Sequence, residues 1–353
     1  MNTTLVFPAA RRVGSRGFSL IELMIAMTIA FIVLAGIGFV YLESRNSFRS
    51  MENLSRMQES ARYALDMMAR DIRMAGYRGC ASANVTVHNA LNRSAESAYN
   101  FDLPMTGYDA VPGGWNPSLP TDSGGLSGLN ILSGTDAIIV RSAFGGGATV
   151  TKQPGLNSSA DLQVTAPNDL AINDIVMVTN CKAATVFQIT NMNVNGAGHN
   201  VVHNVGATHP GNATKNLVEN YAASGGEIVK MQSKTYFIRT GASGAPALWQ
   251  YDNYRPIGGS NPAELADGVE NLQIQYGIDA NSDGVVESYV TADAVADWKL
   301  VAAVRISLLL SSRDDMIATG AQTYTYNGSQ ITASDRRLRQ AFTTTVSVRN
   351  KTQ

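Results

Sequence analysis

The longest apolar run in the chain lies near its start, from Phe18 to Leu42 (FSLIELMIAMTIAFIVLAGIGFVYL), and Glu22 is the only charged residue within it. As a helix, about 25 residues reach about 37 Å, which is enough to cross a hydrocarbon layer of about 30 Å. Arg11, Arg12 and Arg16 precede the run with no acid among them. The positive-inside rule then places the N-terminus in the cytoplasm and everything after Leu42 outside it. Residues 18–42 are therefore predicted to form a transmembrane helix.

Beyond Leu42, apolar residues recur at steps of three and four, as on one face of a helix. They are Phe48, Met51, Leu54, Met57, Ala61, Leu65, Met68, Ile72 and Ala75. Gly76 and Gly79 then supply a stop signal. The pattern predicts one long helix from Phe18 to Ala75, whose amphipathic continuation (residues 43–79) packs on a globular domain. A free coiled coil is the alternative.

After Cys80 the apolar period changes to two, which is typical of strands with one buried face. Seven runs show it, separated by Gly, Asn and Pro clusters: Asp136–Arg141, Asp174–Thr179, Thr185–Thr190, Lys234–Arg239, Asn271–Ile278, Val301–Leu310 and Thr344–Val348. Pro104–Asn130 is expected to be a loop and Gly145–Gly147 a hinge or turn. The expected fold class is α+β: a long N-terminal helix packed on a mainly antiparallel β-sheet domain (residues 80–353) with long loops, which are candidate binding surfaces.

Composition excludes several classes of function. The formal net charge of -1 gives no overall attraction to nucleic acid. The sequence contains no G-x-S-x-G, P-loop or H-E-x-x-H pattern, which weakens the case for a membrane-tethered enzyme. Cys80 and Cys181 are too few for structural zinc, which needs about four closely spaced ligands. A location outside the cytoplasm favours a Cys80–Cys181 disulfide over two buried thiols.

One loop has the D-x-N-x-D-G spacing of calcium sites. Its candidate ligands are Asp279, Asn281, Asp283, Val285 through its carbonyl, and Glu287. Val290 occupies the twelfth position, where calcium loops have a bidentate Glu, so an Asp/Asn/Gly hairpin turn is the alternative. His199 and His203 lack a third ligand nearby and are expected to be solvated loop residues instead of a metal pair.

Glu22 is unusual because an unpaired carboxylate in hydrocarbon costs several kcal/mol, which marks it as a functional candidate. A secretory signal peptide would have a shorter apolar region and a small-residue cleavage site. The sequence Gly17-Phe18-Ser19-Leu20-Ile21-Glu22, after a basic leader, instead resembles the class III signal of type IV prepilins. That resemblance implies a leader peptide (residues 1–17), cleavage between Gly17 and Phe18 by a prepilin peptidase, and N-methylation of Phe18. It also implies that Glu22 pairs with the terminal amine of a neighbouring subunit during assembly.

Four further blocks resemble the PilW minor pilins: Met57–Cys80, Asn173–Thr190, Glu264–Asp279 and Val304–Leu308. The resemblance implies a non-enzymatic subunit, without a required cofactor, that helps to initiate type IV pilus assembly near the filament tip. Implied partners are other minor pilins (the FimU, PilV, PilX and PilE types), a PilY-type tip adhesin, the major pilin, the prepilin peptidase and the inner-membrane assembly platform. Implied locations are the inner membrane, with a periplasmic domain, and then the pilus. A J-type pseudopilin of type II secretion, a competence-pilus subunit and a calcium-dependent binding module remain alternatives.

Overall fold

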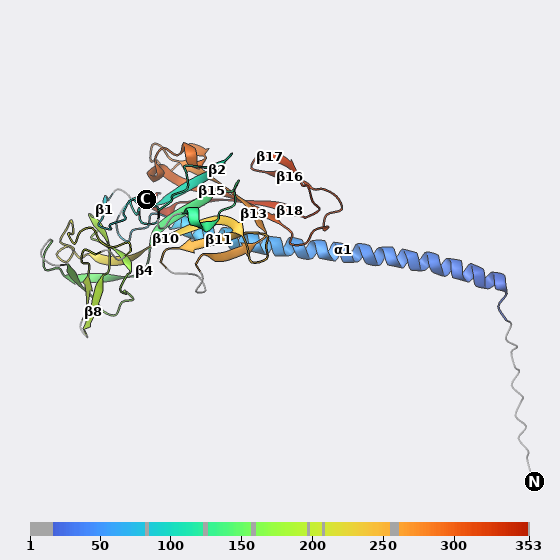
Figure 1. Cartoon of the computed structure of the whole chain (residues 1–353), viewed down its shortest axis with the longest axis horizontal. Coiled ribbons are helices and arrows are strands. Elements are labelled where there is room, and N and C mark those ends of the chain that lie inside the picture. Colours follow the sequence, from blue (N-terminus) through green and yellow to red (C-terminus); the bar gives the residue numbers. More distant parts are fainter. Residues whose placement is uncertain are drawn as a thin grey trace, which may run out of the picture. The chain divides into compact units, whose positions relative to one another are not determined.

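The computed structural model describes residues 17–81, 85–122, 126–156, 160–195, 198–206, 209–254 and 261–351. The predicted leader, apart from Gly17, lies outside these residues. The chain divides into two compact units, one up to Glu52 and one from Asn53 onward, and helix α1 (Leu20–Arg73) begins in the first and ends in the second (Figure 1). The boundary between the units falls inside the predicted amphipathic segment 43–79, and the subdivision at residues 17, 42 and 79 stays a prediction.

Helix α1 has 54 residues, Leu20–Arg73, against the predicted Phe18–Ala75. It ends before two glycines in the left-handed region, Gly76 (φ 71°) and Gly79 (φ 64°). This conformation suits glycine and is common just past a helix C-terminus. A Cβ on Gly76 would lie 3.0 Å from the Cβ of Pro104. Glycine at position 76 therefore both ends the helix and lets the chain pass close to the segment at Pro104.

The predicted apolar stripe is buried only over its second half, which packs in the second unit. The buried residues of α1 are Met57, Ala61, Ala64, Met68, Ala69 and Ile72. Ala64 and Ala69 were not part of the predicted stripe, and their small side chains permit a close approach of the helix to its neighbours. Phe48 and Met51 belong to the first unit and are 69% and 68% exposed. The packing of these two residues on the globular domain stays a prediction.

A twelve-stranded sheet forms one part of the second unit, and its pairings are antiparallel except for β1 with β7. Its main order is β1-β7-β6-β10-β4-β5-β9-β8, with β11 and then β12 added to β10, and β2 and then β3 added to β4. The bounds are β1 Val87–Asn89, β2 Met105–Val111, β3 Gly114–Asn116, β4 Ala137–Lys152, β5 Asp161–Val164, β6 Ile175–Thr179, β7 Ala184–Gln188, β8 Asn191–Asn195, β9 Gly198–Val202, β10 Glu227–Thr240, β11 Pro246–Asp252 and β12 Ala263–Asp267.

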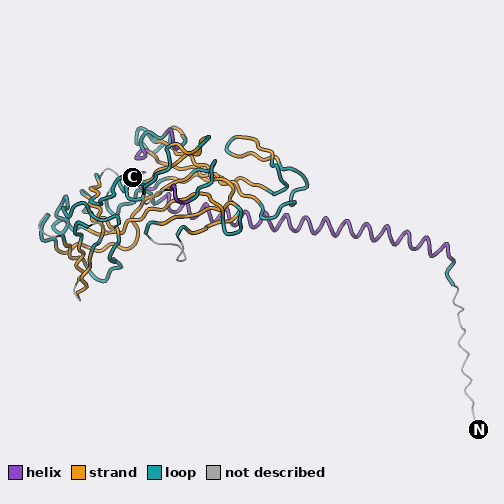
Figure 2. The backbone as a smooth tube through the Cα atoms, viewed as in Figure 1, coloured by secondary structure: helices purple, strands orange, loops and turns teal. Residues whose placement is uncertain are grey.

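A second, four-stranded antiparallel sheet has the order β14-β13-β15-β18. Its strands are β13 (Val269–Ile278), β14 (Ser288–Val290), β15 (Val301–Ser311) and β18 (Arg339–Ser347), and a separate hairpin consists of β16 (Thr323–Tyr326) and β17 (Ser329–Thr332). Short 3-10 turns η1 to η4 cover Leu126–Leu129, Ala292–Ala294, Trp298–Leu300 and Arg349–Lys351. Beyond α1, the second unit consists of strands, connecting loops and these short 3-10 turns (Figure 2). The expected fold class, a long helix with a mainly antiparallel sheet domain, is confirmed.

One hydrophobic core joins the second half of α1 to both sheets. It combines the buried stripe of α1 with residues of β4 and β10 from the large sheet and of β13, β15 and β18 from the small one. A polar cluster lies beside this core, where Asp71 of α1 accepts hydrogen bonds from Lys234 Nζ (3.0 Å), Tyr236 OH and Gln250 Nε2 (3.4 Å). Lys234 also balances the charge of Asp71 as an ion pair. Apolar burial and the charged contact of Asp71 thus both hold the helix.

All seven predicted strands lie within or overlap observed strands, namely β4, β6, β7, β10, β13, β15 and β18. The expected loop Pro104–Asn130 is wrong, because it contains β2, β3 and η1. Gly107 lies inside β2 because the hydroxyl of Tyr276 occupies the place where a Cβ would be. The expected hinge Gly145–Gly147 is also wrong. It lies within β4, where the pairing with β10 shifts register between Ile228 and Lys230, as at a β-bulge.

We expect Met68→Ala to lower the free energy of unfolding of the second unit by about 2–5 kcal/mol, because it removes a fully buried side chain from the shared core. Met51→Ala is the matched control and should change it by less than about 0.5 kcal/mol, because that side chain is largely exposed. Urea unfolding of the full chain in detergent measures both. Equal effects of the two substitutions would contradict the packing described.

Candidate functional site

The start of α1 brings together the residues of the predicted N-terminal signal. Gly17, Phe18 and Ser19 precede the first helical residue, and Phe18 is 84% exposed. The backbone N–H of Glu22 donates to Ser19 Oγ (3.3 Å), and the backbone N–H of Ser19 donates to Glu22 Oε2 (3.4 Å). This reciprocal pair is a capping box, which satisfies two of the free N–H groups at a helix start.

The capping box gives Glu22 a local role that the sequence analysis missed, although S-x-x-E before an apolar run is its signature. The carboxylate also lies in the first turn of the helix, where the helix dipole favours a negative charge. Glu22 is therefore held at the helix start, four residues after Phe18 at the predicted cleavage site. Cleavage, methylation and pairing with a neighbour stay predictions.

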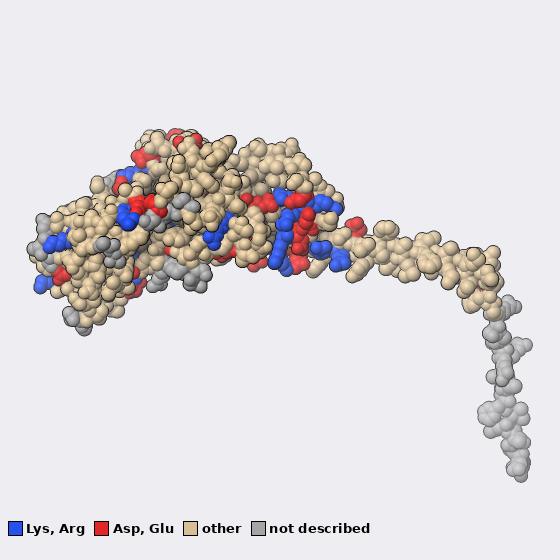
Figure 3. Space-filling model, in the orientation of Figure 1, with Lys and Arg blue, Asp and Glu red and all other residues tan. Residues whose placement is uncertain are grey.

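The apolar half of α1 has a surface suited to lipid or to other apolar helices. Large apolar side chains from Leu20 to Leu42 are exposed, and α1 is the helix, among the described residues, that is long and apolar enough to span a membrane. In Figure 3 this stretch is almost free of charged side chains, which appear further along the helix. Thr28 Oγ1 donates to the carbonyl oxygens of Met24 (3.0 Å) and Ile25 (2.8 Å), so its hydroxyl is satisfied within the helix.

A disulfide joins Cys80 to Cys181, with their Cα atoms 4.9 Å apart, and this prediction is confirmed. Cys80 lies just past the end of α1, and Cys181 lies in the turn between β6 and β7. The bridge spans a sequence separation of 101 residues. The disulfide therefore attaches the segment that follows α1 to the large sheet.

Two buried arginines hold the segment near residues 97–102 close to this junction. Arg78 donates through Nη2 to the carbonyl oxygens of Phe101 (3.0 Å) and Asp102 (2.7 Å). Arg141 donates through Nε to the carbonyl of Ser97 (3.0 Å) and through Nη1 to Thr106 Oγ1 (3.0 Å). Burial lowers the pKa of Arg78, and it lowers the pKa of Arg141 to about 10, which is still high enough to keep Arg141 a cation at neutral pH. Their charges are solvated by backbone carbonyls in place of water.

The calcium-like loop connects β13 to β14 as a hairpin, and its acidic residues do converge. One carboxylate oxygen each from Asp279, Asp283 and Glu287 lies within 4.8 Å of the others. The Asp279 carboxylate accepts the backbone N–H groups of Asp283 (3.1 Å) and Gly284 (3.0 Å), and Asn281 Oδ1 accepts that of Asp283 (3.0 Å). These bonds are those of a self-supporting turn. Calcium at this loop, with Val285 as carbonyl ligand, stays a prediction.

The two histidines of interest occupy different environments. His199 lies on β9, and its Nδ1 is 3.0 Å from Asn168 Oδ1. His203 is only 1% exposed and stacks against Phe187, with ring centroids 4.7 Å apart. Burial lowers the pKa of His203 to about 4, which keeps the ring neutral at physiological pH. The expectation of a solvated histidine is therefore wrong for His203, which is a core residue.

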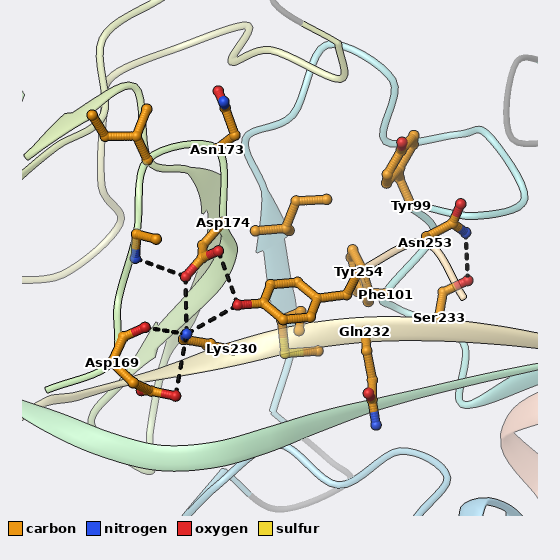
Figure 4. Close-up of a pocket in the computed structure, with 14 residues that line it drawn as sticks. Tyr99, Phe101, Asp169, Asn173, Asp174, Lys230, Gln232, Ser233, Asn253 and Tyr254 are labelled. Carbon is orange, nitrogen blue, oxygen red and sulfur yellow. Dashed lines mark hydrogen bonds and ion pairs between the residues drawn. The ribbon is translucent and has the colours of Figure 1, made fainter. Parts of the chain in front are cut away.

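A pocket of about 340 Å³ lies where β10 meets the segment before β6, and the sequence analysis did not find it. Lys230, 1% exposed, lies 3.2 Å from Asp169 Oδ2 and 3.1 Å from Asp174 Oδ2, and donates to Tyr254 OH (2.9 Å; Figure 4). The sequence feature that could have indicated this buried cluster is the lone lysine among apolar residues in EIVKM.

Burial alone would lower the pKa of Lys230, but its hydrogen bonds to Tyr254 and to Asp174 outweigh burial and raise the pKa above the ordinary value. The amine is therefore protonated and fully engaged, and does not offer a nucleophile. Its contacts describe a structural ion cluster that ties β10 to the segment before β6.

Two segments of the chain match known families. Residues 235–350 match the family described as type IV pilus-assembly protein W (PilW), and residues 12–38 match the prokaryotic N-terminal methylation motif. A comparison with curated proteins finds no match. Among solved structures, the chain is similar to a type IV-like pilin from Thermus thermophilus, with 14% identity, 84% of this chain and 98% of that chain covered, and a TM-score of 0.30. A likeness at that level supports no conclusion about this chain.

Calcium titration calorimetry on the full chain in detergent tests the loop of Asp279. We expect weak binding, with a dissociation constant of about 10⁻⁴–10⁻³ M, because the loop gathers three carboxylates but lacks the closing bidentate Glu. Asp283→Asn should weaken it at least about tenfold by removing one carboxylate ligand, whereas Glu219→Gln, an exposed acid elsewhere, should not. The absence of any binding heat in the unmodified chain would leave the loop as a hairpin turn alone.

Proposed function

Because the chain is a type IV pilin-family protein of the PilW family, we propose that it is a minor pilin that helps to initiate pilus assembly and lies at or near the pilus tip. The observation that supports this most directly is Glu22, an acidic side chain in the first turn of a helix whose following apolar surface is exposed. A catalytic role has no comparable support, and proteins of this family are structural.

The assembly step proposed for Glu22 follows from electrostatics. Cleavage between Gly17 and Phe18 would leave an amine on Phe18, next to the capping box. A carboxylate inside a membrane-spanning segment costs up to about 3 kcal/mol at the helix centre. The hydrogen bond from Ser19 offsets part of that cost but leaves the charge unbalanced. The terminal amine of a neighbouring subunit would balance this negative charge. Pairing the two ions would therefore lower the electrostatic free energy of both helices.

The expected topology and partners follow from the same proposal. The N-terminus lies in the cytoplasm, the second unit in the periplasm, and the chain later enters the filament. Its partners are other minor pilins, a PilY-type tip adhesin, the major pilin, the prepilin peptidase and the inner-membrane assembly platform. The motif at residues 12–38 supports recognition by the peptidase, since it covers Arg12, Arg16 and the Gly17–Phe18 step.

Glu22→Ala in the host is expected to reduce surface pili at least about tenfold and to abolish twitching, because the charge that pairs with the neighbour's amine is removed. Glu43→Ala, an acid beyond the predicted span, is the matched control and should leave both unchanged. Electron-microscopic pilus counts and motility assays provide the readout.

Cleavage and methylation of the N-terminus are followed separately, in the same strains and in a strain whose chain carries Gly17→Val. Mass spectrometry of the N-terminal peptide should find methylated Phe18 in the Glu43→Ala control, and an uncleaved chain when Gly17 is replaced by Val. Normal piliation and twitching in cells whose chain carries Glu22→Ala would refute the assembly role.

A further inference from the structure

β18 is the last strand of the four-stranded sheet, and its outer edge is covered only at its start. There β18 contacts β16, and the side chain of Gln322 bonds both the N–H (2.6 Å) and the carbonyl (2.8 Å) of Arg339, whereas no strand in the described residues pairs with Ala341–Ser347 on that side. Val348 donates its N–H to the carbonyl of Ala302 (2.8 Å), and the antiparallel register pairs Ile306 with Thr344. In such a register, alternate residues direct their backbone groups to the partner strand and the others direct them away. Even-numbered residues of β18 therefore face β15, and the backbone N–H and C=O groups of Ala341, Thr343, Thr345 and Ser347 face outward.

This edge lacks the features that normally prevent edge-to-edge pairing, which are charges, prolines, bulges and short length. β18 has nine residues, and after Arg339 it reads QAFTTTVS, without charge or proline. Arg339 itself is engaged by Glu270 (2.7 and 2.9 Å) and by Asp335.

The other terminal strands in the described residues are protected. β1, β3 and β14 have three residues each, β12 contains Glu264 and Asp267, and β8 is a five-residue strand rich in Asn, which disfavours strands. The strands of the separate hairpin have four residues each. Among these edges, β18 alone is long, uncharged and rich in β-branched residues.

We propose that β18 pairs with the β18 of a second copy of this chain, antiparallel about a two-fold axis at Thr344. In this register Phe342 of one copy lies opposite Val346 of the other, Thr343 opposite Thr345, and Ala341 opposite Ser347. Aromatic–β-branched and Thr–Thr pairs are both favourable across strands. The outward backbone groups of Ala341 to Ser347 become hydrogen-bonded pairs, and the two four-stranded sheets join into one.

The chemistry of the strand argues for a second copy as the occupant. A two-fold interface requires a surface that is complementary to itself. The segment from Ala341 to Ser347 meets that requirement on both faces of the sheet. On the core side Phe342 and Val346 flank Thr344, and on the solvent side the exposed Thr343 and Thr345 have hydroxyls that can bond to each other. From Ala341 to Ser347 no charge opposes a like charge. Beyond these residues the same register places Arg339 of one copy opposite Arg349 of the other, and Arg339 is already paired with Glu270 and Asp335.

Engineered disulfides test the register in the full chain in detergent. Since Cys80 and Cys181 are bonded to each other, an introduced cysteine is the only free thiol. Thr344→Cys places the two thiols at the axis, on Cα atoms about 4.5 Å apart, within disulfide range. Thr343→Cys is the matched control, because its symmetry mate is displaced by two residues, about 7 Å along the strand, and lies out of reach. We expect at least about fivefold more covalent dimer from Thr344→Cys on non-reducing gels.

Thr345→Pro, added to Thr344→Cys, provides a second test. Proline at position 345 removes an outward N–H and leaves the ladder with β15 intact, so the domain should fold and cross-linking should fall at least about fivefold. Thr345→Ala keeps the N–H and should retain the cross-link, and melting curves establish that each variant is folded. Equal cross-linking at positions 343 and 344, as association through α1 alone would give, overturns the proposal. So does an absent Thr344→Cys dimer, or one that survives Thr345→Pro in a folded chain.

Discussion

Burial of the second half of α1 against both sheets is the contact on which the domain depends. The small sheet and the large sheet share one core, and Met57 to Ile72 supply the helical side of it. Alanines at positions 61, 64 and 69 permit the close approach, and Asp71 adds a charged contact to Lys234 and Tyr236. The same helix begins with a surface that suits an apolar medium. The domain is therefore built around the second half of the helix whose first half would anchor it.

The chain beyond the helix is held by contacts that only the folded protein can form. Gly76 turns the chain, Arg78 is buried against the carbonyls of Phe101 and Asp102, and Cys80 is bonded to Cys181. Arg141 holds the same region through Ser97. The connection through residues 97–102 is thus held in place by buried cations. This makes it a weak candidate for an adaptable binding loop.

The sequence predicted the features that depend on local pattern. Period-two runs gave strands such as β13 and β15, and period-3.6 runs with two glycines gave the helix and its end. Features that depend on distant partners were missed: Gly107 belongs to a strand because Tyr276 lies against it, and Lys230 is buried because Asp169 and Asp174 reach it from another segment. At the N-terminus, the signal residues Gly17, Phe18 and Glu22 could be found from their order alone. The capping role of Glu22 is local too, because residues 19–22 carry the S-x-x-E pattern of a capping box.

Glu22 and the edge of β18 both have polar groups whose proposed partners come from outside the chain, but the free-energy cost of leaving these groups unpaired differs. In an apolar medium a carboxylate has no water to solvate it. Leaving it unpaired therefore costs free energy wherever the helix is embedded. The backbone groups of β18 face solvent, and each hydrogen bond with another strand replaces one with water, which leaves only a small net gain. Pairing through β18 would therefore be weak for chains free in solution. Chains held in one membrane by α1 would meet at a much higher effective concentration, and a weak self-complementary edge can then be sufficient.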